Sequence, residues 1–443
     1  MRSTFCKVKL KDILSVRRGT SLSGQYYSTK GNKIRLTLGN FNYPSGGFKD
    51  NTSKDNIFFI GPVKEEYILH KGDIITPLTE QVAGLLGETA KIPADNIYIQ
   101  SGDIGLIIPK ENKLYKGFAY YLISSKPIKY QLGAAAQQTK IRHTSPEKIE
   151  NCIAWVPNDL NVQKNISDFL DALNNKIMLN NKINQELEQM AKTLYDYWFV
   201  QFDFPDEKGR PYKSANGKMI YNEVLKREIP EGWEVGTFSS YIHQDKGGDW
   251  GKDTCSGNYT KKVSCIRGAD FPSLLGHSSS NAPIRYILNK NSSKVLSYGD
   301  LIIEISGGSP TQSTGRIGYI NQHALDKFDT DIITSNFCKA ISLNNDKALY
   351  NFYLEWERLY KADVFFNYEG KTTGIKNLLF DTFVESYKIA IPPKNVISSF
   401  YDNVSNIFEK IQFNSKENSW LQTVRDFLLP LLMNGQITVS SEY

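Results

Sequence analysis

A glycine-rich run at residues 247–254 approaches the pattern of a nucleotide-phosphate loop, which makes it the first candidate for chemistry. It reads Gly247-Gly248-Asp249-Trp250-Gly251-Lys252-Asp253-Thr254. A phosphate-binding loop requires the spacing G-x-x-x-x-G-K-[ST], in which backbone N–H groups cradle the phosphates. Here Lys246 stands where the first glycine is required, and Asp253 follows the lysine. The run fails the motif at two positions, so we interpret it as a flexible turn.

Asp300 and Glu304 form a second candidate, because paired carboxylates can hold the divalent cations of a nuclease. The lysine expected two residues after Glu304 is Ser306 instead. A related segment in the first half of the chain has Asp73 and Pro77 at the matching positions. An active centre duplicated for function should keep both acids in both copies. We therefore predict that these carboxylates are not catalytic.

Cysteine and histidine spacing indicates no metal site. The five cysteines include no C-x-x-C pair, and the five histidines include no H-E-x-x-H pair. We expect reduced thiols packed as small apolar side chains. The sequence thus predicts no metal, no cofactor and no catalytic residue on this chain.

The net charge is +6 across 443 residues. A mild positive surplus is compatible with a nucleic-acid partner and proves little by itself. The first residues contain no apolar signal-peptide core, and the apolar run Phe427–Met433 is far shorter than the roughly 20 residues of a membrane span. We expect a soluble, cytoplasmic protein.

The chain contains an internal repeat, whose clearest element is Leu69–Ile75 matched by Leu296–Ile302. Four weaker matches follow in the same order: Leu38–Phe41 with Arg267–Phe271 (one residue inserted before the phenylalanine), Gly84–Gly87 with Gly315–Gly318, Lys140–Ile141 with Gly374–Ile375, and Trp155–Pro157 with Ala390–Pro392. The shared order supports a duplication. Short β-rich runs between turn residues, with intervening helical segments, predict two mixed α/β halves.

A heptad pattern follows each half and predicts a long helix. Seam positions of the first are Val162, Ile166, Phe169, Leu173, Ile183, Leu187, Met190, Leu194 and Tyr197, and those of the second are Phe400, Val404, Ile407, Ile411, Leu421 and Leu428. Both seams are interrupted at corresponding positions, by Lys176 and Asn180 in one helix and by Asn414 and Asn418 in the other. This polar layer either marks a bend or exposed patch, or fixes the register of two antiparallel helices packed together.

Four segments give the chain a resemblance to a known family. They are Leu194–Pro205, Ile229–Glu234, Val263–Phe271 and Leu428–Ile437. On these segments the chain resembles, over essentially its whole length, the specificity subunits of type I restriction–modification systems. The resemblance implies host defence by two domains that each read half of a split double-stranded DNA target. It also implies two modification subunits that carry S-adenosylmethionine and the methylation chemistry, and endonuclease/translocase subunits.

Taken together, the repeat, the heptads and the resemblance predict an α+β protein. Two mixed α/β target-recognition domains in tandem are each followed by a long helix, and the two helices pack as an antiparallel coiled coil. The predicted divisions are recognition domain 1 (1–157), a central spacer helix (158–204), a linker (205–230), recognition domain 2 (231–392), a C-terminal helix (393–435) and a tail (436–443).

The sequence favours a non-enzymatic role, since an adenine methyltransferase needs an Asn/Asp-Pro-Pro-aromatic motif. The nearest run, Ile391–Lys394, has the wrong flanking residues. Two alternatives remain open. One is a two-subunit system whose partner both methylates and cleaves DNA, and the other is a coiled-coil assembly adaptor that does not read DNA.

Polar loops in both halves are the candidate DNA contacts, because exposed basic and amide side chains reach base edges and phosphates. The predicted DNA-binding residues are Arg17, Arg18, Gln137, Gln138, Thr139, Lys140, Arg142 and His143 in the first half, and Gln312, Ser313, Arg316, Lys371, Thr372, Thr373 and Lys376 in the second. The run 306–316 is longer and more basic than its counterpart 79–84, as expected if the halves read different sequences. Simple solvated loops are the alternative.

Overall fold

The computed structural model describes residues 5–43, 46–52, 55–80, 84–135, 142–276, 282–307, 309, 311–371 and 375–439. The chain forms two compact units, of which the first comprises Met1–Asn175 with Leu421–Tyr443 and the second Lys176–Trp420. Each unit contains one half of the repeat. The two long helices α4 (Leu160–Tyr195) and α9 (Lys394–Met433) each contribute a segment to both units.

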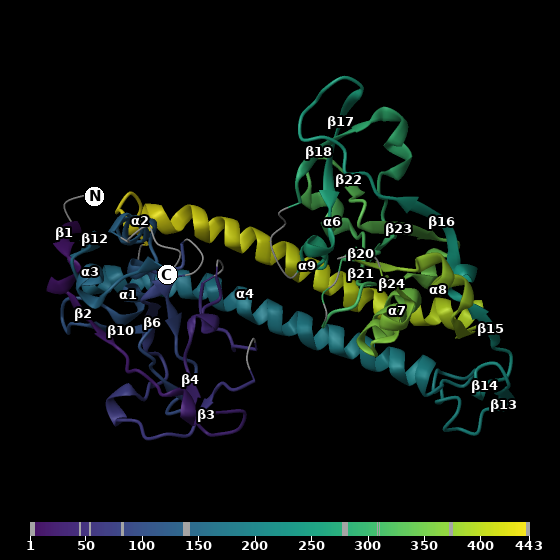
Figure 1. The fold of residues 1–443 in the computed structure, drawn as a ribbon, viewed down its shortest axis with the longest axis horizontal. Helices are drawn as coiled ribbons and strands as arrows, with labels where there is room; N and C mark the ends of the chain where they lie inside the picture. Colours follow the sequence, from purple (N-terminus) through teal and green to yellow (C-terminus); the bar gives the residue numbers. More distant parts are fainter. Residues whose placement is uncertain are drawn as a thin grey trace. The chain divides into compact units, whose positions relative to one another are not determined.

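The first unit is built on an antiparallel sheet in the order β2-β10-β6-β8 (Figure 1). Its strands are β2 (Leu14–Arg18), β10 (Ile104–Pro109), β6 (Ile74–Pro77) and β8 (Ala90–Lys91). Successive side chains of a strand point to opposite faces. Accordingly, Ile74 and Ile107 join one hydrophobic core with the helix residue Phe118, while Ile75 and Leu106 join another. Both faces of this sheet are therefore buried.

The second unit repeats this design with the order β16-β23-β19-β21. The strands are β16 (Ile242–Gly247), β23 (Cys338–Leu343), β19 (Leu301–Glu304) and β21 (Ile317–Tyr319). Leu301 and Ile303 pack into the core that contains helix α7 (Leu349–Lys361), while Ile302 packs into a separate core on the other face. The predicted duplication is confirmed, because β6 and β19 occupy the same place in the two sheets.

The match of Leu38–Phe41 with Arg267–Phe271 was predicted to contain one inserted residue, and the hydrogen bonds that cap the two segments show that this prediction is wrong. In the first unit the backbone N–H of Thr37 donates to the side chain of Asn40 at 2.9 Å. In the second unit the N–H of Arg267 donates to Asp270 at 3.0 Å. The two short 3₁₀ turns thus correspond residue for residue, and no residue is inserted before the phenylalanine that follows each turn.

The predicted match of Gly84–Gly87 with Gly315–Gly318 is also wrong, because it is out of register by three residues. Ile75 lies opposite Ala90 in the first sheet, and Ile302 lies opposite Gly318 in the second. Gly87 therefore corresponds to Gly315, and both have left-handed φ angles, +85° and +96°. Glycine identity misled the sequence alignment, whereas the hydrogen-bonded register fixes the correspondence.

Smaller sheets complete each unit. In the first unit they are β1 (Phe5–Lys9) with β12 (Ile153–Pro157), β7 (Thr79–Glu80) with β11 (Arg142–His143), and β3 (Tyr27–Ser28), β5 (Phe58–Phe59), β4 (Ile34–Arg35) and β9 (Tyr98–Ile99). In the second they are β15 (Glu234–Thr237) with β26 (Lys388–Ile391), β18 (Ile284–Leu288), β17 (Tyr259–Ile266) and β22 (Asp331–Thr334), and β20 (Ser306–Gly307), β25 (Lys376–Leu378) and β24 (Glu369–Lys371).

Short helices cover the sheets. They are α1 (Lys116–Ile123), α2 (Lys126–Ala135) and α3 (Pro146–Glu150) in the first unit, and α5 (Phe271–Leu274), α6 (Gln322–Lys327) and α8 (Phe380–Ser386) in the second. The segment predicted as a linker contains a hairpin of β13 (Met219–Asn222) and β14 (Arg227–Pro230). Within the described ranges, no helix combines the length and apolar character of a membrane span.

Both long helices form where the heptads predicted them. Asp159 caps the start of α4 by accepting the N–H of Asn161 at 2.8 Å, since an N-cap carboxylate satisfies a backbone donor that has no intrahelical partner. The α-helix ends at Tyr195 and is followed by a π-helical turn, Asp196–Val200. The predicted helical stretch 158–204 is thus longer than the observed helix. Phe202, two residues after the π-helical turn, has a left-handed φ of +65°, which is not helical.

Candidate nucleic-acid interface

A buried carboxylate holds the basic side chain that ends the polar loop of the first half. Strand β11 pairs with β7 so that Arg142 lies opposite Glu80 and His143 opposite Thr79. An Nη1 of Arg142 lies 3.5 Å from Oε1 of Glu80, whose side chain is only 3% exposed. The other carboxylate oxygen accepts the backbone N–H groups of Gly84 and Leu86, both at 3.0 Å. Glu80 therefore binds two backbone N–H groups of one segment and one cation.

The second half has an equivalent arrangement. Strand β25 pairs with β20 and places Lys376 opposite Gly307, which is the position of Arg142 in the first half. The Nζ of Lys376 lies 3.0 Å from Glu369 and 4.5 Å from the ring centroid of Phe366. Glu369 also accepts the backbone N–H of Thr314 at 2.8 Å. In both halves a carboxylate thus binds a basic strand residue and a backbone N–H group at once.

Several predicted contacts lie outside the described residues. They are Gln137, Gln138, Thr139, Lys140, Thr372 and Thr373. Lys371 closes strand β24 through its backbone, opposite Lys376. His143 is exposed at the end of β11.

The three candidates on the run 306–316 have different surroundings. Gln312 is exposed and donates to the hydroxyl of Tyr360 at 3.3 Å. Ser313 is only 3% exposed. Arg316 forms two hydrogen bonds to Glu304, at 2.8 and 2.7 Å, and this pairing raises its pKa. As placed, Gln312 alone of the three offers its side chain freely to a partner.

The carboxylates considered above for cation binding have partners within the second unit. Asp300 is 3% exposed, pairs with Lys246 at 2.7 Å and accepts the hydroxyl of Ser342 at 2.6 Å. Glu304 pairs with Arg316. In the described residues, no group of three or more metal-ligating side chains could hold an ion.

Arg17 and Arg18 lie at the end of β2. Arg17 donates to the carbonyl oxygen of Glu66, and its Nε is buried with no hydrogen-bond partner in the described residues. Arg18 is exposed. The pair thus presents one constrained and one open guanidinium.

The predicted polar layer is present in the second unit, where α4 and α9 run antiparallel. Asn180 is 1% exposed and donates from Nδ2 to Oδ1 of Asn418 at 2.9 Å and to Oε2 of Glu417 at 2.6 Å. The bond to Glu417 lowers the pKa of that carboxyl. Lys176 forms an ion pair with the same glutamate at 3.1 Å. The two asparagines that correspond in the repeat therefore bind each other.

Asn414 bonds to a residue that the heptad did not predict. Its Nδ2 donates to Oδ1 of Asn184 at 2.8 Å, and both side chains are nearly fully buried. Asn184 also donates to the hydroxyl of Ser415 at 3.4 Å. The layer is thus larger than the four predicted residues, and its polar groups satisfy one another, as burial requires.

Comparison with known proteins finds similarity to one family. A sequence model of the type I restriction modification DNA specificity domain matches residues 2–189. The type I restriction enzyme MjaIX specificity subunit of Methanocaldococcus jannaschii is 26% identical, over 75% of this chain and 71% of its own. The HindI specificity subunit of Haemophilus influenzae is 24% identical, over 77% and 81%. The chain is thus similar to the type I restriction–modification specificity subunits, and its residues 2–189 match their DNA specificity domain.

A solved structure supports the fold of this chain. The S subunit of a type I restriction–modification system from M. genitalium aligns with a TM-score of 0.57 at 14% identity, over 97% of this chain and 96% of that chain. The correspondence extends along almost the entire chain, so the two-domain, two-helix architecture is shared.

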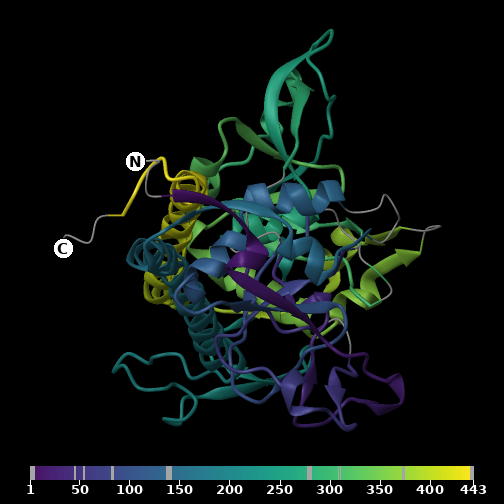
Figure 2. The ribbon, with the colours of Figure 1, turned by 90° about the vertical axis from the view of Figure 1, so that its left-hand side faces the viewer.

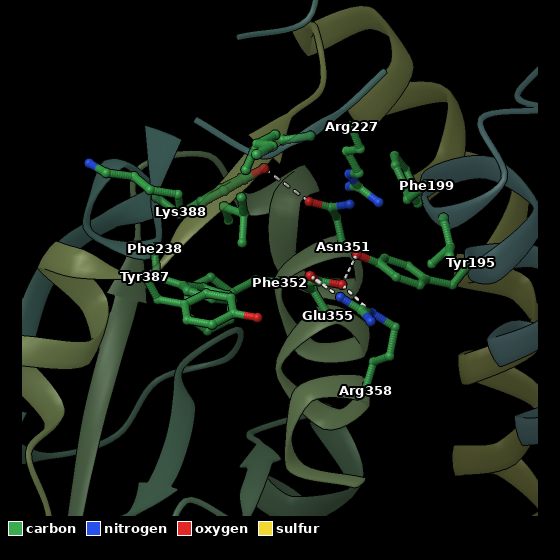
Figure 3. Close-up of a pocket in the computed structure, with 15 residues that line it drawn as sticks. Tyr195, Phe199, Arg227, Phe238, Asn351, Phe352, Glu355, Arg358, Tyr387 and Lys388 are labelled. Carbon is green, nitrogen blue, oxygen red and sulfur yellow. Dashed lines mark hydrogen bonds and ion pairs between the residues drawn. The ribbon is translucent and has the colours of Figure 1, made fainter. Parts of the chain in front are cut away.

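The second unit also contains a cavity of about 220 Å³ (Figure 3). Its polar side chains largely bind one another. Glu355 accepts the hydroxyl of Tyr195 at 2.8 Å and forms two hydrogen bonds with Arg358. Asn351 accepts the hydroxyl of Tyr241 at 3.1 Å. The bond between Tyr195 and Glu355 joins the end of α4 to α7, which indicates a structural role in holding that helix end.

Sequence reasoning missed the ordered surroundings of the run 247–254. The run was interpreted as a flexible turn, but Gly247 ends β16 and the backbone after it is held in place. The backbone N–H of Asp249 donates to the carbonyl oxygen of Thr334 at 2.9 Å, and Lys252 pairs with Tyr286 as an isolated bridge. A Cβ on Gly248 would lie 1.9 Å from the carbonyl oxygen of Ser335, so this glycine permits a close backbone approach.

Proposed function

We propose that this chain is the non-catalytic specificity subunit of a type I restriction–modification complex, in which each recognition domain reads one half of a split double-stranded DNA site. The observation that carries the proposal is the matched placement of Arg142 and Lys376 at equivalent strand ends, each held by a glutamate whose side chain is less than 10% exposed. A basic side chain fixed on a rigid strand is suited to contact phosphates or base edges with a defined orientation. The curated relatives are specificity subunits of restriction enzymes.

In this proposal the chemistry resides on partner subunits. Two modification subunits bind the specificity subunit and carry S-adenosylmethionine, and endonuclease/translocase subunits join them. This chain determines the DNA sequence at which the reaction takes place, and α4 and α9 set the length of the unread spacer. The antiparallel layer around Asn180 and Asn418 supports a fixed helix register, which a spacer of constant length requires.

The proposal is tested by sequencing the methylome of cells that contain or lack this gene. We expect one methylated motif with two short half-sites and an unspecified spacer, which disappears on deletion and returns on complementation. A complemented Arg142→Gln strain should lose methylation through the first half-site and Lys376→Gln through the second. Lys208→Gln, at an exposed linker position, is the matched control.

Two results would contradict the proposal. One is methylation or cleavage by the purified chain without any partner. The other is a footprint of the assembled complex that lacks two separated half-sites, which would favour an assembly adaptor. The protein that co-purifies distinguishes the remaining alternative, since a single partner that both methylates and cleaves would indicate a two-subunit system.

A further inference from the structure

The three-stranded sheet β18-β17-β22 carries lysine and tyrosine side chains that are not among the DNA contacts considered so far. Strands β17 and β18 extend beyond the four-stranded sheet of their own unit (Figures 1 and 2). One face of this extension is apolar and encloses a small core of Val263, Cys265, Ile287 and Ile333. The outward part of the opposite face is left to solvent, and the inference concerns that face.

The strand register aligns three of its residues in one row. Lys262 lies opposite Tyr286 in the antiparallel pair β17–β18, and an isolated bridge places Lys252 opposite Tyr286 on the other side. Residues directly opposite each other project from the same face of a sheet. Since neighbouring strands lie about 4.8 Å apart, the backbones of the two lysines are about 10 Å apart.

A fourth side chain joins this row through a bulge. The register of β17 shifts between Tyr259 and Lys261, which turns the ring of Tyr259 toward the same face as Lys262. The Nζ of Lys252 lies 4.5 Å from the Tyr259 ring centroid, a cation–π contact that orients the ammonium without neutralising it. We call these four residues, Lys252, Tyr259, Lys262 and Tyr286, the lysine–tyrosine face.

The charges of this face are uncompensated within the described residues. Lys252 and Lys262 are both exposed, and neither has a carboxylate within ion-pair distance in that part of the chain. Lys261, on the apolar side of the same strand, pairs with Asp331 at 2.9 Å. The solvent face of the sheet therefore presents two exposed cations beside aromatic rings that are available to an anionic partner, whereas the lysine on the apolar side is paired.

We propose that the lysine–tyrosine face binds the phosphate backbone of double-stranded DNA next to the half-site that the second domain reads. The inference rests on the proposed function and adds a contact surface to it. Two lysines whose backbones lie about 10 Å apart can address two phosphates rather than one small anion. Lysine and tyrosine supply point charges and hydroxyl donors, which suit phosphate oxygens, whereas the row contains none of the Arg, Asn or Gln side chains that form bidentate bonds to bases.

The salt dependence of binding by the assembled complex tests this proposal. The probe is a duplex that contains the methylated motif of the wild-type complex, and affinity is measured between 50 and 200 mM salt. Each phosphate contact contributes about 0.9 to the slope of log affinity against log salt. The Lys252→Gln/Lys262→Gln double variant should lower that slope by about 2, so that wild-type affinity falls about 12-fold more than that of the variant over this range.

Two variants serve as controls, and the methylome supplies a second readout. Lys208→Gln should keep the wild-type slope, and Lys252→Arg/Lys262→Arg should restore it, which shows that charge rather than folding is responsible. The methylated motif should stay unchanged in every variant. A glutamine variant whose slope equals that of Lys208→Gln overturns the inference and leaves the proposed function intact. A changed second half-site overturns it too, because the face would then read bases. Absence of any split-site binding by the wild-type complex overturns the proposed function and this inference with it.

Discussion

The asparagine layer between α4 and α9 yields a prediction whose magnitude follows from its geometry. Asn180→Ala removes the 2.9 Å hydrogen bond to Asn418 and leaves the carbonyl oxygen of a side chain that is 4% exposed without that donor. Leaving a buried acceptor unsatisfied costs about 1–3 kcal/mol, and the lost hydrogen bond adds about 1 kcal/mol. The bond to Glu417 contributes little more, because that carboxylate can be rehydrated. We expect a loss of about 2–4 kcal/mol.

The double variant Asn180→Leu/Asn418→Leu should behave differently. Replacing both partners removes the unsatisfied oxygen and substitutes apolar packing, which is often neutral or stabilising. The remaining partner of Asn418 is Asn181, which is exposed and can bind water instead. We therefore expect stability near that of the wild type and a coupling energy of about 2–4 kcal/mol between the two positions.

Hydrogen exchange of the full-length chain measures this effect locally, which avoids assuming two-state unfolding for a chain of two units. Peptides that cover 173–188 and 408–422 should lose protection in the single variant and regain it in the double variant. Asn403→Ala, at an exposed position on α9, should change protection by less than about 0.5 kcal/mol. A single variant that matches Asn403→Ala, or a double variant that equals the sum of its singles, would refute the reasoning.

Three further predictions concern other parts of the molecule. Burial lowers the pKa of His323, so as the pH falls below about 6.5 the unfolded chain gains a proton that the folded chain does not. The free energy of unfolding should therefore drop by up to about 1.4 kcal/mol per pH unit. Thermal unfolding at pH 7.5 and 5.5 should show a smaller loss in His323→Gln and an unchanged loss in His243→Gln. Glu369→Gln should destabilise the strand end that holds Lys376 by about 1–3 kcal/mol and slow methylation through the second half-site. Glu80→Gln should slow methylation through the first half-site. Methylation kinetics on duplexes with one altered half-site would separate the effects of the two variants. Adding one heptad within 171–187 lengthens α4 by about 10 Å, so methylome sequencing should report a longer spacer or no activity with both half-sites unchanged; a changed half-site with the old spacer would contradict the spacer role of the helix.

Much of the fold could be predicted because it depends on patterns local to each element. The repeated strand Leu69–Ile75 and its partner Leu296–Ile302 lead into β6 and β19, which are buried on both faces. The heptads likewise predicted α4 and α9 and the pairing of Asn180 with Asn418. Asn184 was missed because its burial depends on more than the helix period. A third segment covers this region, since Gly276 lies so close that a Cβ would be 2.1 Å from the Ser415 hydroxyl.

The candidate DNA contacts were harder to predict, because their environment is set by residues that do not correspond between the halves. Arg142 and Lys376 occupy equivalent positions and were both predicted. Their carboxylate partners are not equivalent: Glu80 lies on β7, directly opposite Arg142, whereas Glu369 lies on β24, on the far side of Lys376. No alignment of the two halves would have paired these glutamates.

This difference bears on how duplicated domains can read different sequences. The backbone frame is conserved between the halves, since strand order and the register of the central strands are the same. The side chains that fix the basic residue are supplied from different strands, so each domain can alter its contact loops without disturbing the shared sheet. The sheet β18-β17-β22 corresponds to β5-β4-β9 of the first unit, but β17 and β18 are longer than β4 and β5, and the lysine–tyrosine face lies on this longer part. This arrangement predicts that exchanging loop 306–316 alters the second half-site alone. A change in the first half-site would show that the frame, rather than the loop, carries the sequence information.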